Sequence, residues 1–327
     1  MNNLKKIGLT ALAASLVSTS VFAGEVTVAG SASMNVEGYS GTALNAGKGF
    51  SMGNQLTFSG SGELDNGLTA SISFVLDQGD NETDTTAGAG TAPFDSHSVS
   101  ISSDALGTLT MHGEGGSNAT SALDTTAAGD IWDTFDNAAF TTGQTVKGAT
   151  SGADIMVYTL PTMIDDLSVS ASYSPQQATA ASSTAYGLTY TGVEGLSVSY
   201  GQGDASTGVS TTEADQTVLK ASYAYGSITV AYSNNDYQTA VASSDQETTS
   251  YKVSYTVSDE LSVSYGQEEI TKEGDTDDAE FEAVTVAYTS GGMTLTAAMK
   301  ESTNGAHNGT SKIDDRDYWS LGLAFAF

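Results

Sequence analysis

Carboxylates are the most abundant chemically active side chains of this chain. The chain has 39 Asp and Glu residues against 10 Lys and Arg, which gives a formal net charge of -29 at pH 7. Such a charge attracts cations and repels anions, so the sequence excludes a nucleic-acid-binding protein. Two acidic runs, residues 275–278 and 314–317, could bind calcium through oxygen ligands, although neither has the twelve-residue pattern of a calcium loop.

The groupings that enzymes need are missing from the sequence. His97, His112 and His307 are the only histidines, and none belongs to a spaced pair of metal ligands. The absence of cysteine removes thiol catalysis and thiolate metal sites. The many serines form no nucleophile elbow, and no Gly-rich phosphate loop joins a strand to a helix. We therefore expect a protein that is not an enzyme and requires no cofactor.

The first 23 residues have the pattern of a secretory signal peptide. Lys5 and Lys6 precede an apolar run, and Val21-Phe22-Ala23 fits a small-residue cleavage site. No cysteine lies near this site, which excludes a lipoprotein. We expect residues 1–23 to be removed and residues 24–327 to form a single domain outside the cytoplasm. No later stretch approaches 18 consecutive apolar residues, so membrane-spanning helices are excluded.

Apolar and small polar residues alternate with a period of two along the rest of the chain. Residues 167–173, 196–200 and 261–265 are clear examples, because each places Leu, Val or Tyr on one face and Ser on the other. Tight turns alternate with long polar loops, as in a transmembrane barrel with short periplasmic turns and long extracellular loops. This pattern predicts sixteen strands at residues 25–39, 51–64, 67–77, 96–103, 107–114, 152–160, 166–174, 184–191, 195–203, 215–225, 227–236, 248–257, 260–269, 279–289, 292–301 and 315–327.

The last strand has large apolar residues at every second position and small residues between them. These residues are Trp319, Leu321, Leu323, Phe325 and Phe327. A soluble domain rarely ends on phenylalanine in this register, which argues against an exported β-sandwich or surface-layer protein. Tyrosines near the predicted strand ends suit the aromatic girdles of a barrel at the two bilayer interfaces. They are Tyr173, Tyr190, Tyr200, Tyr223, Tyr225, Tyr232, Tyr251, Tyr255, Tyr265 and Tyr288.

These features together resemble the Gram-negative general diffusion porins, most of all the acidic porins of marine and phototrophic alphaproteobacteria. Residues 155–161, followed by residues 167–173, are similar to the family's sixth and seventh strands with their short Pro-containing turn. The resemblance implies an all-β fold, a transmembrane antiparallel β-barrel in the outer membrane. It implies a homotrimer with one pore per subunit, in contact with lipid and lipopolysaccharide. The C-terminal strand would be recognised by the barrel-assembly machinery.

The resemblance also implies that the third long loop, residues 115–152, folds into the lumen and forms its constriction. The expected constriction residues are acidic: Glu114, Asp124, Asp130, Asp133 and Asp136. Trp132 and Phe135 could fix the loop to the barrel wall. A loop of this length in a compact fold usually has a function. The alternative is a solvated acidic loop on the surface.

The expected lumen wall differs from that of the best-known porins, which place arginines and lysines on the early strands opposite the acidic loop. Arg316, the only arginine, lies beside the last loop. The strand at residues 152–160 is ambiguous, because either Ile155 and Val157 or Met156 and Tyr158 could face the lumen. The register of the other strands predicts these lumen residues: Glu37, Gln55, Glu63, His112, Lys220 and Lys252.

A net negative lumen predicts a passive, cation-preferring channel for small hydrophilic solutes. A substrate-specific channel is one alternative, although no ladder of aromatic or charged residues lines the predicted lumen. A closed barrel with a structural or adhesive role is the other.

Overall fold

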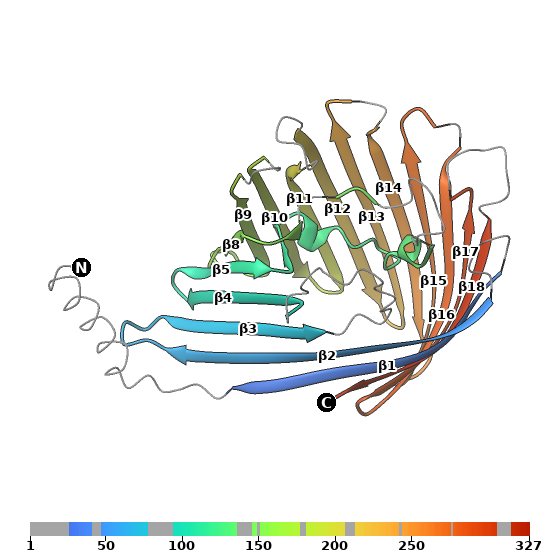
Figure 1. Cartoon of the computed structure of the whole chain (residues 1–327), viewed down its shortest axis with the longest axis horizontal. Coiled ribbons are helices and arrows are strands. Elements are labelled where there is room, and N and C mark those ends of the chain that lie inside the picture. Colours follow the sequence, from blue (N-terminus) through green and yellow to red (C-terminus); the bar gives the residue numbers. More distant parts are fainter. Residues whose placement is uncertain are drawn as a thin grey trace, which may run out of the picture.

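The computed structural model describes residues 26–40, 47–77, 94–135, 146–148, 151–176, 181–206, 213–241, 244–275, 277–305 and 315–327. This part of the chain forms a closed antiparallel barrel of sixteen strands, in which β1 pairs with both β2 and β18 (Figure 1). None of its helices is long and apolar enough to cross a bilayer. The predicted signal peptide, residues 1–23, lies outside the described residues.

The sixteen barrel strands are β1 (Thr27–Ser40), β2 (Gly47–Glu63), β3 (Thr69–Asp77), β4 (Ser96–Ser103), β5 (Gly107–Glu114), β8 (Ile155–Thr159), β9 (Leu167–Ser174), β10 (Ser183–Val193), β11 (Leu196–Ser206), β12 (Glu213–Tyr225), β13 (Ile228–Thr239), β14 (Gln246–Thr256), β15 (Leu261–Lys272), β16 (Ala279–Ser290), β17 (Met293–Thr303) and β18 (Arg316–Ala326). Four short elements lie between β5 and β8: β6 (Gly116–Ser117), the 3-10 helices η1 (Ser121–Leu123) and η2 (Ile131–Phe135), and β7 (Ser151–Gly152).

Every predicted strand is present, and the differences lie at the strand ends. The strand predicted at residues 152–160 is shorter, because Ile155–Thr159 pairs with β5 and only Met156–Thr159 pairs also with β9. The strand predicted at residues 227–236 continues to Thr239, since its polar end still pairs with β12. Backbone pairing can therefore extend beyond the alternating apolar residues by which a strand is recognised in the sequence.

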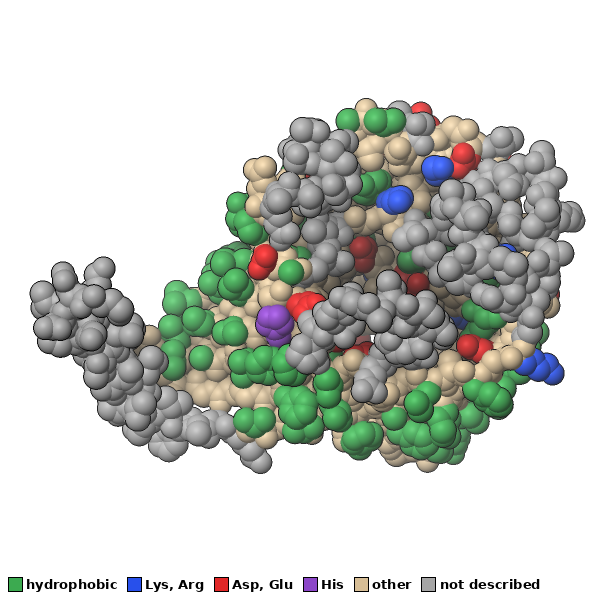
Figure 2. Space-filling view, viewed as in Figure 1, with side chains coloured by type: hydrophobic (Ala, Val, Ile, Leu, Met, Phe, Trp, Pro, Cys, Tyr) green, Lys and Arg blue, Asp and Glu red, His purple; other side chains and the backbone are tan. Residues whose placement is uncertain are grey.

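The outer face of the barrel is apolar. Figure 2 shows hydrophobic side chains spread over the outer surface of the molecule. All ten tyrosines predicted for the girdles lie on this face, where nine are exposed and Tyr232 packs against Tyr251 with ring centroids 5.2 Å apart. Met156 and Tyr158 also point outward, whereas Ile155 is fully buried on the inner face, which resolves the register of β8. The inward and outward sets match a barrel with lipid outside and a polar lumen.

The barrel closes between the first and last strands. β18 pairs with β1 from Asp317 to Ala326, and Phe327 exchanges two backbone hydrogen bonds with Gly30, at 2.7 and 2.9 Å. The five large apolar residues of the predicted terminal pattern all point outward. The pairing of the last residue removes a free strand edge at the seam.

Candidate functional site: the lumen and the third loop

The segment between β5 and β8 lies inside the barrel. Its two 3-10 helices rest against the inner faces of β11 and of β15 to β17, and Figure 1 shows the green segment crossing the interior. The third loop thus follows the wall formed by β9 to β18. β1 also contacts the loop, because the hydroxyl of Tyr39 donates to the carbonyl of Thr134 at 3.0 Å. The inner faces of β2 to β5 lie opposite the loop, across the lumen.

Wall serines hold the loop backbone. Three backbone N–H groups of the loop donate hydrogen bonds to wall hydroxyls: Ala119 to Ser172 at 2.9 Å, Ala127 to Ser233 at 2.8 Å and Ala128 to Ser250 at 2.9 Å. A buried loop needs such partners, because an unpaired backbone N–H away from water is costly. The serines of this wall therefore satisfy the backbone of the loop.

Glycines on the same wall make room for the loop. A β-carbon at Gly187 would lie 2.5 Å from the carbonyl oxygen of Ala119, and one at Gly266 would lie 2.8 Å from the β-carbon of Ala128. Glycine inside a strand often marks a close approach of another backbone. Both positions permit direct contact between loop and wall.

Glu268 of β15 binds the loop at two points. Its side chain is fully buried, and it accepts hydrogen bonds from the Thr126 hydroxyl and from the backbone N–H of Trp132, the latter at 2.9 Å. Between these points the Thr126 hydroxyl also accepts from the N–H of Asp130, which has a positive φ of 55°. Glu268 thereby fixes the tight turn that presents Asp130.

An apolar seat holds η2. Ile131 and Phe135 are buried against Ile270 and Phe281 on the inner faces of β15 and β16, and the rings of Phe135 and Phe281 lie 5.9 Å apart. Here the usual polarity of the strands is inverted. Apart from Glu268, the inward residues at the seat are apolar, while the neighbouring outward residues are carboxylates: Glu269, Glu280 and Glu282. Of the residues predicted to fix the loop, Phe135 is fully buried and Trp132 is half-buried beside the seat.

Asp124 belongs to a polar network between the loop and β12. Gln216 donates to its carboxylate at 3.5 Å and to Asn235 at 2.8 Å, and Asn235 donates to the backbone carbonyl of Lys147 at 3.0 Å. The network thus joins both limbs of the loop. Burial raises the pKa of Asp124 to about 6, with a further increase from the Asp130 charge, while Gln216 and Lys220 act in the opposite direction.

Two wall lysines bind loop oxygens. Lys220 of β12 donates to the carbonyl of Thr125 at 2.7 Å, and Lys300 of β17 donates to the hydroxyl of Thr134. The ammonium group of Lys300 also lies 5.7 Å from the ring centre of Tyr318. These two positive charges therefore lie between the loop and the wall that carries it.

The predicted constriction residues take different positions. Asp133 is exposed, Asp130 is half-buried, and Asp124 lies in the network described above. Glu114 ends β5 at the base of the loop, where it pairs in register with His97. Asp136 lies outside the described residues.

The six predicted wall residues occupy both sides of the lumen. Glu37, Gln55, Glu63 and His112 face inward from β1, β2 and β5, and the Tyr318 hydroxyl donates to Glu37 at 2.8 Å. Lys220 and Lys252 face inward from β12 and β14. Arg316 is buried on the inner face of β18, in register with Ser302. No Lys or Arg faces inward within the described residues of β1 to β5.

Sequence reasoning missed Glu268, Lys300 and the apolar seat. The inverted pattern could have revealed them, because residues 279–283 place Ala and Phe at inward positions and Glu at outward positions. Carboxylates that face lipid destabilise a barrel, so the inversion indicates that this end of β16 lies beyond the hydrocarbon and faces protein inside.

Comparisons with known proteins agree with this architecture. The model of the Gram-negative porin family matches residues 8–289. A refined porin structure has 19% identity and a TM-score of 0.66, over 93% of this chain and 100% of the other. The trimer form of OmpT from Vibrio cholerae has 14% identity and a TM-score of 0.68 over the same shares. A mutant Rh. blastica porin, again over these shares, has 15% identity and a TM-score of 0.65. Curated protein sequences give no match.

The family match covers most of the chain, and the fold match covers nearly all of it. The family match points to an outer-membrane channel, and the fold match shows the barrel. The chain therefore belongs to the Gram-negative porin family and is a multi-pass β-barrel of the outer membrane.

Proposed function

We propose that this porin is a passive, cation-preferring diffusion channel for small hydrophilic solutes, with the third loop as its constriction. The carrying observation is the segregation of charge around the loop. Lys220 and Lys300 bind loop oxygens on the wall side, whereas the carboxylate of Asp133 is exposed. Carboxylates in a polar lumen raise the local concentration of cations and hinder the entry of anions.

The test is the reversal potential of the purified protein in a planar bilayer under a KCl gradient. We expect ohmic steps and a cation-selective potential. The double variant Asp130→Ala/Asp133→Ala should lower the permeability ratio of potassium to chloride by about two- to threefold, the effect of removing nearby charges screened by water and salt.

The control is Glu280→Gln/Glu282→Gln, which removes two carboxylates from the outer face of β16. It should leave the ratio unchanged, because these groups are separated from the lumen by the wall. Absence of conductance would favour the closed barrel with a structural or adhesive role. Anion preference would overturn the proposed mechanism.

We also propose that the channel is a homotrimer surrounded by lipid and lipopolysaccharide. The apolar outer face supports contact with lipid and with neighbouring subunits. One solved porin of the same fold is a trimer. The outward terminal pattern from Trp319 to Phe327 is proposed as the signal that the barrel-assembly machinery binds. Loop-bound calcium remains a proposal, since parts of both acidic runs, at Thr276 and Asp314, lie outside the described residues.

A further inference from the structure

The wall opposite the third loop carries a regular array of hydroxyl groups. We name it the hydroxyl lattice and define it as Ser59, Ser61, Ser71, Ser73, Ser98 and Ser100, on β2, β3 and β4. Cross-strand pairing sets two rows: Ser59 opposite Ser73 and Ser73 opposite Ser98, then Ser61 opposite Ser71 and Ser71 opposite Ser100. Paired residues point to the same face, so all six hydroxyls belong to the lumen wall.

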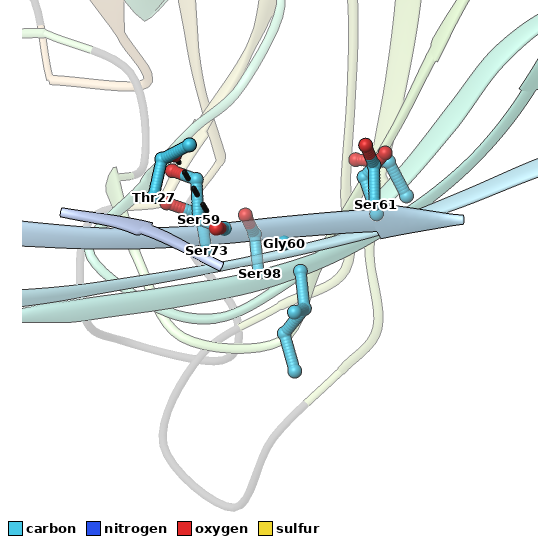
Figure 3. Close-up of a pocket in the computed structure, with 9 residues that line it drawn as sticks. Thr27, Ser59, Gly60, Ser61, Ser73 and Ser98 are labelled. Carbon is cyan, nitrogen blue, oxygen red and sulfur yellow. Dashed lines mark hydrogen bonds between the residues drawn. The ribbon is translucent and has the colours of Figure 1, made fainter. Parts of the chain in front are cut away.

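These residues line a hollow of about 340 Å³ together with Thr27, Gly60 and Ile72. In Figure 3 the labelled hydroxyls of Ser59, Ser61, Ser73 and Ser98 all lie on one side of the strands. Ser98 pairs with His112, two residues before the point where the third loop leaves β5 at Glu114. The lattice therefore begins just below the base of the loop.

Most hydroxyls of the lattice are uncommitted. Ser100 shares a hydrogen bond with Thr110 at 2.9 Å, but the side chains of the other five make none with the described part of the chain. The opposite wall differs, because Ser172, Ser233 and Ser250 accept bonds from the loop. Three serines beside the loop thus bind protein, whereas five serines of the lattice have no side-chain hydrogen bond to the described residues.

A hydroxyl both donates and accepts, so an array of hydroxyls can match a solute that also does both at several positions. Neighbouring strands lie about 4.8 Å apart, a spacing comparable with that of non-adjacent hydroxyls on a sugar ring. A simple cation would interact only with the oxygen of each hydroxyl, and a simple anion only with its hydrogen. Each bond to a solute replaces one to water, so the attraction is weak, as rapid passage requires.

We infer that the hydroxyl lattice is a weak binding track for uncharged, polyhydroxylated solutes such as small sugars, across the lumen from the loop carboxylates. This inference rests on the proposed diffusion function and adds a class of preferred solute to it. Cations would follow the loop carboxylates, whereas neutral sugars would follow the serines of β2 to β4.

The test compares two neutral probes, glucose and triethylene glycol, by the swelling rate of liposomes that contain the full-length porin. Triethylene glycol offers mainly acceptors, so it uses the lattice less. The variant Ser59→Ala/Ser73→Ala/Ser98→Ala widens the lumen while removing one row of hydroxyls. We expect glucose entry to slow by at least about twofold, with unchanged or faster entry of triethylene glycol. The KCl conductance should not fall.

Two further variants control for structure and position. Ser59→Thr/Ser73→Thr/Ser98→Thr keeps the hydroxyls, so it should keep the ratio of glucose to triethylene glycol rates near that of the unmodified porin. Ser222→Ala/Ser254→Ala/Ser264→Ala removes three inward hydroxyls from the other wall and should leave this ratio unchanged.

The outcomes separate the two proposals. The binding track is overturned if the alanine variant of Ser59, Ser73 and Ser98 speeds the entry of both probes in proportion. It is also overturned if the alanine variant of Ser222, Ser254 and Ser264 slows glucose entry equally. In both cases the proposed diffusion channel stands. If the unmodified porin gives no conductance and no swelling, the diffusion function itself has failed.

Discussion

Asp124 is a loop residue whose charge changes with acidity near neutral pH. Its pKa of about 6, raised by burial, means that its carboxyl is charged at pH 7.5 and neutral at pH 5. Cation selectivity should therefore fall as the pH is lowered through 6, in addition to any change caused by other groups. The measurement is the reversal potential of the unmodified porin between pH 5 and 7.5.

The matched variant is Asp124→Asn, which keeps the size of the side chain and its place beside Gln216. At both pH 5 and pH 7.5 this variant should show the lower cation selectivity that the unmodified porin has at pH 5, without a step near pH 6. A step of full size in this variant would assign the titration to another group, and His112 on the opposite wall is the first to examine.

Glu268 is expected to keep the loop in one position. In Glu268→Ala, the Thr126 hydroxyl and the Trp132 N–H lose their buried acceptor, at a cost of about 1–3 kcal/mol each. The loop should then occupy several positions, visible as fluctuations between current levels at constant voltage. Ser250→Ala removes one neutral hydrogen bond and should disturb the current less. A Glu268→Ala trace as steady as that of the unmodified porin would show that the apolar seat alone holds the loop.

At the scale of elements, β18 closes the barrel by pairing with β1 and is followed by Phe327. Removal of Phe327 deletes the two backbone bonds to Gly30 and exposes the edge of β1. The yield of folded barrel in the outer membrane should fall several-fold, as measured by the shift in gel mobility between heated and unheated samples. Leu321→Ala, an outward change within the same strand, should have a smaller effect.

Refolding in detergent separates two causes of that loss. If the shortened chain also refolds poorly, the seam hydrogen bonds are the reason. If it refolds normally but fails in cells, the terminal residue serves recognition by the assembly machinery. Normal yield in both settings would remove Phe327 from either role.

The strands could be predicted because each one obeys a local rule. A segment such as Leu261-Ser262-Val263-Ser264-Tyr265 alternates regardless of its partners, so period and turns suffice to locate it. The attachment of the loop follows no local rule. Glu268 and Thr126 are far apart in sequence, and only the closed barrel brings them together. The acidic residues of the loop could be named from the sequence, whereas the wall residues that hold the loop could not.

At the scale of the whole molecule, the assembled porin is expected to be a three-chain species in mild detergent, as sedimentation would show. If its acidic loops bind calcium, the chelator EDTA should lower the temperature at which this species dissociates, because a bound ligand stabilises the state that binds it. Added calcium should restore that temperature and sodium should not. An unchanged dissociation temperature would remove calcium from the account, and a one-chain species would remove the trimer.

The inverted polarity of β15 and β16 also sets the height of the proposed constriction. Glu280 and Glu282 point outward beside the seat of η2, so this height lies outside the hydrocarbon, toward the extracellular surface. Asp133 is therefore at a small electrical distance from the outside. A cationic blocker added outside would cross little of the applied voltage to reach it, whereas one added from the periplasm would cross most of it. The same carboxylate would thus give nearly voltage-independent block from one side and steeply voltage-dependent block from the other.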